Sequence, residues 1–254
     1  MQKNCDFAPP PQPFLPPGLN ELHLWCARLE THGHLLRACA GWLTPEERRR
    51  AARFVREPDR DLFTLARGMA RELLGRCLDV APGAVQFECN ECGKPRLAAV
   101  SDHFAIRFNI AHSHGAALCG ITSGVELGVD LERIRPDFAT AAIAQRFFAP
   151  AEAAILSRLP ETRQTRAFFE CWTRKEAYLK ARGLGLSLPL ASFEVAFGPG
   201  ASPAVLRATD DPGASRRWTL LPLEPWPDFV GAAVVEMTNP AVRLWEWQPR
   251  TDVP

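Results

Sequence analysis

The chain lacks long apolar runs and any large excess of charge of one sign. Its 254 residues carry 30 Lys and Arg against 29 Asp and Glu, and the resulting net charge of +1 gives no general affinity for polyanions, so we expect no nucleic-acid partner. No apolar segment is long enough for a signal peptide or a membrane span. Together with a hydrophobic content of 46%, this predicts a globular, cytoplasmic protein without a membrane partner.

The chain has eight cysteines but not the spacing of a disulfide framework. Cys89 and Cys92, in "CNEC", have metal-like spacing, yet no second Cys/His pair follows at a useful distance. We interpret them as two free thiols in a turn, in a protein from a reducing compartment. A Ser-His-Asp or Cys-His signature is missing as well, so the sequence points to no nucleophile of its own.

Hydrophobic periodicity and turn signals predict an α+β fold. A flexible, proline-rich lead-in is expected at residues 1–18. A strand follows at 22–29. Thr44 then opens a helix as its N-cap, with Glu47 placed to complete a capping box.

The second part of the chain contains the clearest strand, "GVELGVDLERI", in which apolar and polar residues alternate. Helices are expected after it at about 139–158 and 162–182, and Gly183 is suited to a left-handed C-cap. A weak internal repeat relates "ARF", a helix and "VQFE" to "QRFF", a helix and "SFEV". Two α+β halves, residues 19–122 and 123–254, would explain this similarity.

Two acidic side chains project from one face of the clearest strand. Asp130 and Glu132 lie two residues apart, so their carboxylates can converge on a hard cation. The alternative is a half-exposed strand with a polar outer side, since alternation is the commonest strand pattern. The strand by itself favours this plainer interpretation.

A third acid lies on the helix expected at 162–182. Glu176 falls inside the apolar stripe of that helix, where a carboxylate is partly desolvated and needs a partner or a metal. Lys180, one turn later, is either a surface partner of Glu176 near the helix end, where the dipole favours cations, or a cation beside a bound phosphate. Asp130, Glu132 and Glu176 together would suit Mg²⁺.

Several further residues could contact a phosphate, although composition does not decide the matter. "FNIAHSHG" contributes Asn109, His112 and His114 in a polar break after a strand, and two histidines there raise the odds of a site only modestly. Arg50 belongs to a run of Arg that is most often a solvated helix face, yet its guanidinium could bind a phosphate through two hydrogen bonds.

Taken together, these segments resemble the 4′-phosphopantetheinyl transferases of the surfactin-synthetase-activating type. "GVDLE" alone would be weak evidence, but the long segment "WTRKEAYLKARGLGLSLPL" joins it about forty residues later, and the order and spacing fit the family. The resemblance runs from roughly residue 44 to residue 197. It also includes the segments "TPEERRRAARF", "GKP", "FNIAHS" and "RFFAPAE".

The resemblance implies a fold and a reaction. Such enzymes are pseudo-dimers of two similar α+β halves with the active site in the cleft between them, so we expect one monomer to suffice. They transfer the 4′-phosphopantetheine arm of coenzyme A to a serine of an apo acyl or peptidyl carrier protein and release 3′,5′-ADP. The serine belongs to the partner, which agrees with the missing nucleophile.

The resemblance also implies roles for the acids. Asp130, Glu132 and Glu176 would hold Mg²⁺ on the pyrophosphate of coenzyme A, and Lys180 would bind the same pyrophosphate. Glu176 would in addition deprotonate the incoming serine, directly or through a water. Metal and lysine would cancel charge that otherwise repels the nucleophile, so Asp130, Glu176 and Lys180 are the expected catalytic residues.

The nucleotide would lie against the other matched segments. By resemblance, His112 and Arg50 would hold the 3′-phosphate, with Lys94 and the backbone of the segment from Asn109 to His112 near the nucleotide. One departure is Ala111, where the family usually has a serine, and this puts in doubt a hydroxyl contact to the nucleotide.

Two other functions remain open from the residues alone. The same acids would serve a Mg²⁺-dependent hydrolase of a phosphoanhydride or phosphodiester, with water as the nucleophile. A non-catalytic carrier-binding module would keep the fold without the chemistry, but the presence of all three acids and Lys180 argues against it. The sequence does not reveal whether the carrier serves fatty-acid, polyketide or non-ribosomal peptide synthesis.

Overall fold

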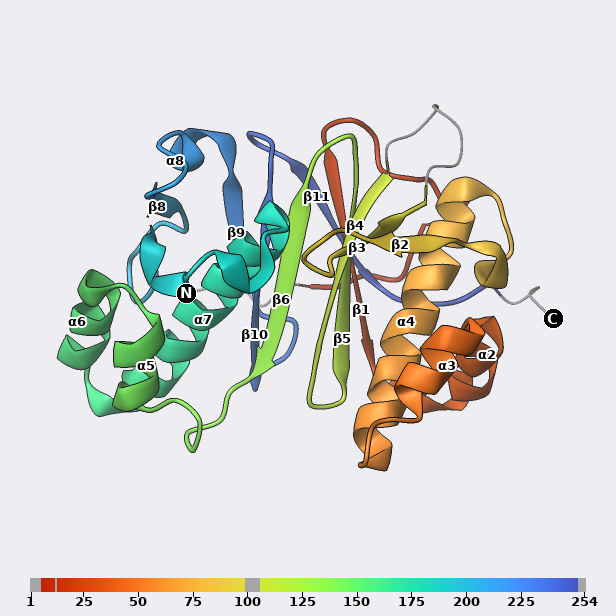
Figure 1. Ribbon diagram of the computed structural model, residues 1–254, viewed down its shortest axis with the longest axis horizontal. Helices are drawn as coiled ribbons and strands as arrows, with labels where there is room; N and C mark the ends of the chain where they lie inside the picture. The colour runs from red at the N-terminus through yellow and green to blue at the C-terminus, as the bar shows by residue number, and fades with distance from the viewer. Residues whose placement is uncertain (1–5, 12, 99–105, 251–254) are drawn as a thin grey trace.

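The computed structural model describes residues 6–11, 13–98 and 106–250, which form two α/β lobes side by side (Figure 1). The first lobe contains β1 (Glu21–Arg28), α1 (Leu29–His32), α2 (Leu36–Trp42), α3 (Pro45–Ala51), α4 (Glu57–Leu78), β2 (Phe87–Cys89), β3 (Pro95–Leu97), β4 (Ile106–Ser113) and β5 (Ala116–Ser123). The second lobe contains β6 (Leu127–Arg133), α5 (Ala141–Phe147), α6 (Pro150–Arg158), α7 (Glu161–Arg182), β7 (Phe193–Val195), β8 (Val205–Ala208), α8 (Ala214–Arg217), β9 (Thr219–Leu223) and β10 (Phe229–Val235). A last strand, β11 (Ala241–Glu246), ends the regular structure.

The two lobes repeat one topology. Each begins with a strand, continues through helices to a 22-residue helix, α4 or α7, and then forms a two-stranded hairpin and an antiparallel strand pair. The strand orders correspond as well, because β1-β5-β4 in the first sheet matches β6-β10-β9 in the second. The α+β pseudo-dimer expected from the faint sequence repeat is therefore confirmed.

Strand β11 crosses back to the first lobe. It pairs in parallel with β1, so the first sheet has the order β11-β1-β5-β4 (Figure 1). The buried indole of Trp247, just after this strand, donates to Glu72 of α4 at 3.0 Å. The boundary between halves expected near residue 122 stays a prediction, with the qualification that the end of the second half completes the sheet of the first.

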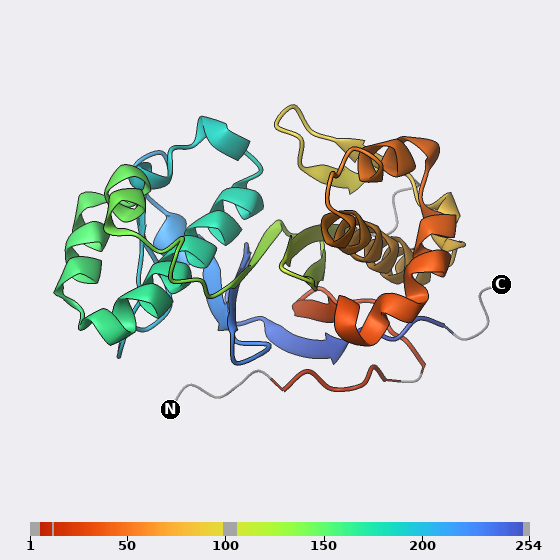
Figure 2. The same ribbon diagram turned by 90° about the horizontal axis from the view of Figure 1, so that it is seen from below.

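The proline-rich start of the chain is extended but packed. Ala8 forms a parallel bridge with Trp245, and the Phe14 ring lies 5.8 Å from that of Trp25. Figure 2 shows this segment running along β11 on one side of the molecule. Proline content predicts extension, but it does not reveal such long-range contacts, which hold residues 6–11 and 13–18 to the fold. The flexible lead-in expected at residues 1–18 stays a prediction, and residues 1–5 and 12 lie outside the described part.

Local signals for several elements are confirmed. Helix α3 begins with the full capping box: Thr44 Oγ1 accepts from the Glu47 N–H, and Glu47 accepts from the Thr44 N–H. Helix α7 ends at Gly183, which has the left-handed φ of 64°. The helix expected at 139–158 is instead two helices, α5 and α6, because Pro150 starts a new helix and cannot continue the preceding one.

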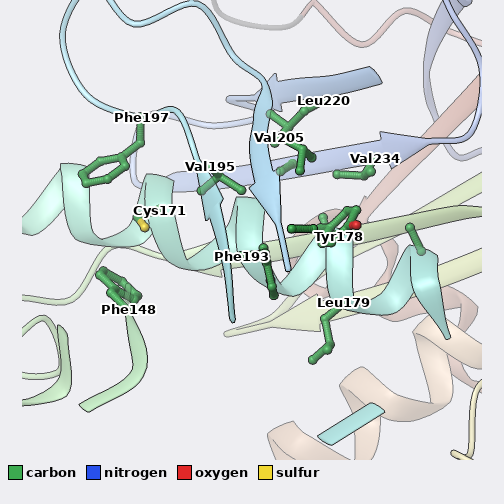
Figure 3. Close-up of a cluster of buried hydrophobic side chains, with 14 of the residues drawn as sticks. Phe148, Cys171, Tyr178, Leu179, Phe193, Val195, Phe197, Val205, Leu220 and Val234 are labelled. Carbon is green, nitrogen blue, oxygen red and sulfur yellow. The ribbon is translucent and has the colours of Figure 1, made fainter. Parts of the chain in front are cut away.

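The core of the second lobe surrounds α7. Tyr178 packs against Phe193 with ring centroids 4.8 Å apart, and Phe148 and Phe197 lie against the first part of the helix (Figure 3). Another apolar cluster surrounds α4 in the first lobe, and a third joins the two sheets through residues such as Leu24 and Val129. The sheets are thus fixed side by side, which positions α7 over β6.

Candidate active site

Helix α7 touches strand β6 at Gly128. A Cβ at this position would lie 2.1 Å from the Ala177 carbonyl oxygen and 2.3 Å from the Ala181 nitrogen, so no larger residue fits without movement. The neighbours of those two alanines in the sequence are Glu176 and Lys180. The glycine of "GVDLE" therefore lets the helix lie directly on the strand, beside Asp130.

Asp130 lies at the centre of the acidic cluster. It is 5% exposed, and its Oδ1 accepts from Lys180 Nζ at 2.6 Å. Its Oδ2 is buried and has no hydrogen-bond partner among the described residues. A buried carboxylate oxygen without a partner is costly, so this atom requires a further cation or donor.

Glu132 and Glu176 lie within electrostatic reach of Asp130. Burial, and then the charge of Asp130, raise the pKa of Glu132 to about 7, although Ser113 Oγ donates to its Oε2 at 2.7 Å. Burial followed by the Asp130 charge also raises the pKa of Glu176, and Lys180 opposes this shift. Burial is thus the main cause of both shifts, the charge of Asp130 adds to each, and Lys180 offsets only part of the effect.

This donor set fits a hard divalent cation. Three carboxylates with an unpartnered oxygen are ligands of the kind that Mg²⁺ prefers, and a bound dication would relieve both the orphaned Oδ2 and the mutual repulsion. Within residues 6–11, 13–98 and 106–250, however, no three Asp, Glu, His or Cys side chains are arranged as a ligand set. Lys180 occupies Oδ1 of Asp130, so metal binding requires side-chain rearrangement, and the assignment of Asp130, Glu132 and Glu176 as ligands stays a prediction.

A cavity of about 320 Å³ adjoins the cluster between the lobes. Glu176 and Lys180 of α7 line one side of it, and Cys92 and Lys94 of the β2–β3 hairpin line another. Asn109 also faces this cavity, but it is 4% exposed and its Oδ1 accepts from the Val129 N–H at 2.9 Å. Its side chain thus joins β4 to β6 across the two sheets.

Basic side chains gather at the first lobe's side of the cleft. His112 is an exposed residue of β4, yet partial desolvation of its ring, followed by the charges of Lys180, Arg50 and Arg67, lowers its pKa. The guanidinium groups of Arg50 and Arg67 both lie over the Phe63 ring, 5.5 and 5.9 Å from its centroid. Arg50, Arg67 and Lys180 thus lie within electrostatic reach of His112, and all three are cationic.

Arg67 of α4 was not expected at this site. Its Nε lies 3.2 Å from Oε1 of Glu47, but its Nη1 is buried without a hydrogen-bond partner among the described residues. Glu47 also accepts from Arg71 Nε at 2.7 Å, so one capping carboxylate has to balance two arginines. In the sequence, Arg67 and Arg71 are four residues apart and therefore share one helix face. This spacing could have indicated a basic site, but the segment was interpreted only as a helix.

The ammonium group of Lys94 is fully hydrogen-bonded within the protein. Its Nζ donates to Glu126 Oε2 at 2.6 Å and to the carbonyl oxygens of Leu127 and Ala181, each at 3.1 Å. All three ammonium protons are therefore used. Cys89 and Cys92 on the same hairpin are exposed free thiols, as the sequence predicts, but Cys89 ends strand β2 and only Cys92 lies in the turn.

Comparison with known proteins agrees with this geometry. The family model described as the 4′-phosphopantetheinyl transferase superfamily matches residues 126–234, and the one described as 4′-phosphopantetheinyl transferase, N-terminal, matches residues 30–125. The chain is 37% identical to the 4′-phosphopantetheinyl transferase HetI of Nostoc sp. over 92% of this chain and 94% of that protein. It is 32% identical to the 4′-phosphopantetheinyl transferase Sfp of Bacillus subtilis over 61% of this chain and 66% of that protein.

Among solved structures, the holo-[acyl-carrier-protein] synthase of Thermotoga maritima shares 20% identity at a TM-score of 0.33, over 44% of this chain and 62% of that one. That score is too low to support an argument. The sequence relatives suffice: the chain belongs to the 4′-phosphopantetheinyl transferases, of the Sfp type. None of the helices in the described part of the chain is both long and apolar enough to cross a membrane.

Proposed function

We propose that this protein transfers the 4′-phosphopantetheine arm of coenzyme A to a serine of an apo carrier protein in a Mg²⁺-dependent reaction, releasing 3′,5′-ADP. The observation that supports it most is the buried, unpartnered Oδ2 of Asp130 beside Lys180, in a cleft between the lobes. A site built to receive a cation next to a lysine suits a pyrophosphate, because the two charges together can balance it.

Asp130, Glu132 and Glu176 would hold Mg²⁺, which supplies charge neutralisation for the pyrophosphate when bound. Lys180, whose Nζ lies 2.6 Å from Asp130 Oδ1, would donate to a phosphate oxygen and stabilise charge on the leaving group.

Glu176 is the group best suited to accept the proton of the carrier serine. It lines the cavity from α7, and burial raises its pKa from the usual carboxylate value, which makes it a stronger base than an exposed glutamate. The phosphopantetheinyl phosphate would pass from the leaving 3′,5′-ADP to the serine oxygen, and the serine proton would go to Glu176 or to a water beside it.

The 3′-phosphate of coenzyme A would bind to the basic cluster of His112, Arg50 and Arg67. The unpartnered Nη1 of Arg67 is the strongest support, because a phosphate oxygen would satisfy a buried cationic donor. Asn109 lies close by, with its side chain bound to Val129, so we expect its contribution to come from the backbone of β4.

We further propose that the protein acts in the cytoplasm as a monomer. The cysteines of the described segments are free thiols, which suits a reducing compartment. Both halves of the cleft come from one chain, so no second copy is needed to complete it.

The reaction can be tested by intact mass. Purified protein with coenzyme A, Mg²⁺ and a panel of apo carriers from fatty-acid, polyketide and peptide synthesis should convert at least one carrier to the form that bears phosphopantetheine. If no carrier gains mass while coenzyme A is hydrolysed by water, the protein is a Mg²⁺-dependent hydrolase instead.

A further inference from the structure

The turn of the β2–β3 hairpin is hydrogen-bonded to the C-terminal end of α7, the helix that carries Glu176 and Lys180. The hairpin belongs to the first lobe, yet Asn90 Nδ2 donates to the Gly183 carbonyl oxygen at 2.9 Å, at the C-cap of α7. Lys94, from the other arm, donates to Ala181 on the same helix and to Glu126 and Leu127 at the start of β6. Two side chains thus connect one lobe to the helix and strand that carry the acids.

The turn itself is rigidly organised. Asn90 Oδ1 accepts from the Cys92 and Lys94 N–H groups at 3.0 and 2.8 Å, which closes an Asx-type turn. Gly93 has a φ of 82°, a left-handed conformation that glycine adopts without strain. Because Asn90 both shapes the turn and binds α7, the turn is presented to the helix in one conformation.

The contact with α7 is close. A Cβ on Gly183 would lie 3.3 Å from Asn90 Nδ2 and 3.3 Å from Lys94 Cδ. Downstream of the helix, a Cβ on Gly185 would lie 3.2 Å from the Cβ of Cys92. The two glycines of "GLG" therefore serve the approach of the hairpin as well as the helix cap, and the hairpin turn and α7 form opposite sides of the 320 Å³ cavity.

We propose that Asn90 and Lys94 are positioning residues that fix the width of the coenzyme pocket by holding the hairpin to the end of α7, and that Lys94 does not itself bind coenzyme A. The proposal rests on the proposed function, since it assigns this cavity to coenzyme A. Lys180 lies one residue before Ala181, so the hydrogen bond from Lys94 to Ala181 also helps to fix the position of the proposed phosphate-binding lysine. Lys94 has no ammonium proton left for a ligand, whereas its carboxylate partner Glu126 lines a different cavity of about 460 Å³.

The decisive variant is Glu126→Ala, because Glu126 does not itself line the 320 Å³ cavity but forms an ion pair with Lys94, which does. We expect Glu126→Ala, Asn90→Ala and Lys94→Met each to weaken coenzyme A binding about tenfold, as measured by titration calorimetry. The double variant Lys94→Met/Glu126→Ala should be no weaker than Lys94→Met alone, because Lys94→Met already removes the Glu126 contact together with the donations to Leu127 and Ala181. Glu126 Oε1 also accepts from Arg107 Nε at 3.0 Å, so Arg107→Met, which should leave coenzyme A binding within about twofold, checks that the effect of Glu126→Ala comes through Lys94. The KM for the carrier should stay within about twofold, since a general loss of structure would raise both constants.

Arg96→Met is the matched control on the same hairpin. Arg96 forms an exposed ion pair with Glu88 at 3.2 Å and does not reach α7, so coenzyme A binding should change less than about twofold. Thermal unfolding checks that every variant is folded. If Lys94→Met does not fold, Glu126→Ala and Asn90→Ala still decide the matter.

If coenzyme A binding is unchanged in Glu126→Ala or in Asn90→Ala, the proposal is overturned. Additive losses in the double variant would also overturn it, because they would mean that Glu126 and Lys94 act independently and not through their ion pair. Calorimetry needs no carrier, so a wild-type protein that binds coenzyme A but modifies no carrier refutes the proposed transfer and leaves the positioning test intact.

Discussion

A fully buried ion pair in the second lobe gives a quantitative prediction. Lys175 is 0% exposed, and its Nζ lies 2.6 Å from Glu152 Oε2 and 2.6 Å from the Phe193 carbonyl oxygen. Glu152, 2% exposed, also accepts from the Ala149 and Val195 N–H groups at 2.9 and 2.8 Å. Helix α6, helix α7 and strand β7 therefore meet at one lysine and one glutamate.

Replacing Lys175 with Met leaves the Glu152 carboxylate buried without its cation. Breaking a buried pair in this way costs about 3–5 kcal/mol, which for a protein of this size lowers the unfolding temperature by roughly 10 °C. The double variant Lys175→Met/Glu152→Gln should regain at least half of that loss, because no uncompensated charge remains. Differential scanning calorimetry with chemical denaturation measures both effects.

The exposed pair Arg207–Glu194 provides the control. Its atoms are 2.9 Å apart, but Arg207 is 74% exposed, so Arg207→Met should change stability by less than about 1 kcal/mol. Coenzyme A binding should be unaffected in folded Lys175→Met, since the Lys175 side chain is fully buried, with its Nζ 4.4 Å from the centroid of the Phe193 ring, and does not line the 320 Å³ cavity. Equal losses in the single and double variants would refute the reasoning, because the cost would then not arise from the unpaired carboxylate.

Three further predictions concern the site. Asp130→Ala should abolish Mg²⁺-dependent transfer, measured by carrier mass, without lowering the unfolding temperature; full activity would mean that the metal assignment is wrong. Arg67→Met and His112→Ala should each weaken binding of coenzyme A more than that of dephospho-coenzyme A, by about tenfold for a charged hydrogen bond; equal losses with both ligands would exclude a contact with the 3′-phosphate. With chelator present, Glu132→Gln should stabilise the protein at pH 8 but hardly at pH 5. Because the Glu132 pKa is raised from 4.5 to about 7 in the folded protein, the carboxyl costs stability progressively between those two pH values and in full above pH 7, on the order of 3 kcal/mol before relaxation, whereas little of this cost is present at pH 5. Unfolding midpoints at the two pH values would contradict this if Glu132→Gln gave no gain at pH 8.

Local features of the fold were predictable because neighbouring residues determine them. The capping box of Thr44 and Glu47 and the left-handed C-cap at Gly183 depend on contacts within a few residues. The repeated topology was only faintly visible, since the two lobes share an order of strands and not many identical residues. The pairing of β11 with β1 joins segments more than 200 residues apart, and no local pattern predicts it.

In the site, too, features set by neighbouring residues were predictable and features set by tertiary packing were not. Helical periodicity alone predicts that Glu176 is partly desolvated, and the structure bears this out with a half-buried side chain and a raised pKa. The burial of Asp130 could not be read from strand alternation, because it arises from the approach of α7 at Gly128. Arg67 was missed for a similar reason: its unpartnered Nη1 follows from how α3 and α4 pack. Lys94 matched a familiar motif, and only its contacts reveal that it joins the two lobes.

The most direct test of the central claim follows both products of one reaction. Apo carrier, coenzyme A, Mg²⁺ and the enzyme should yield one 3′,5′-ADP for each carrier that acquires phosphopantetheine, with neither product formed when the carrier serine is replaced by alanine. Release of 3′,5′-ADP at the same rate with the serine-less carrier would contradict the account, because water would then be the nucleophile and the protein a hydrolase.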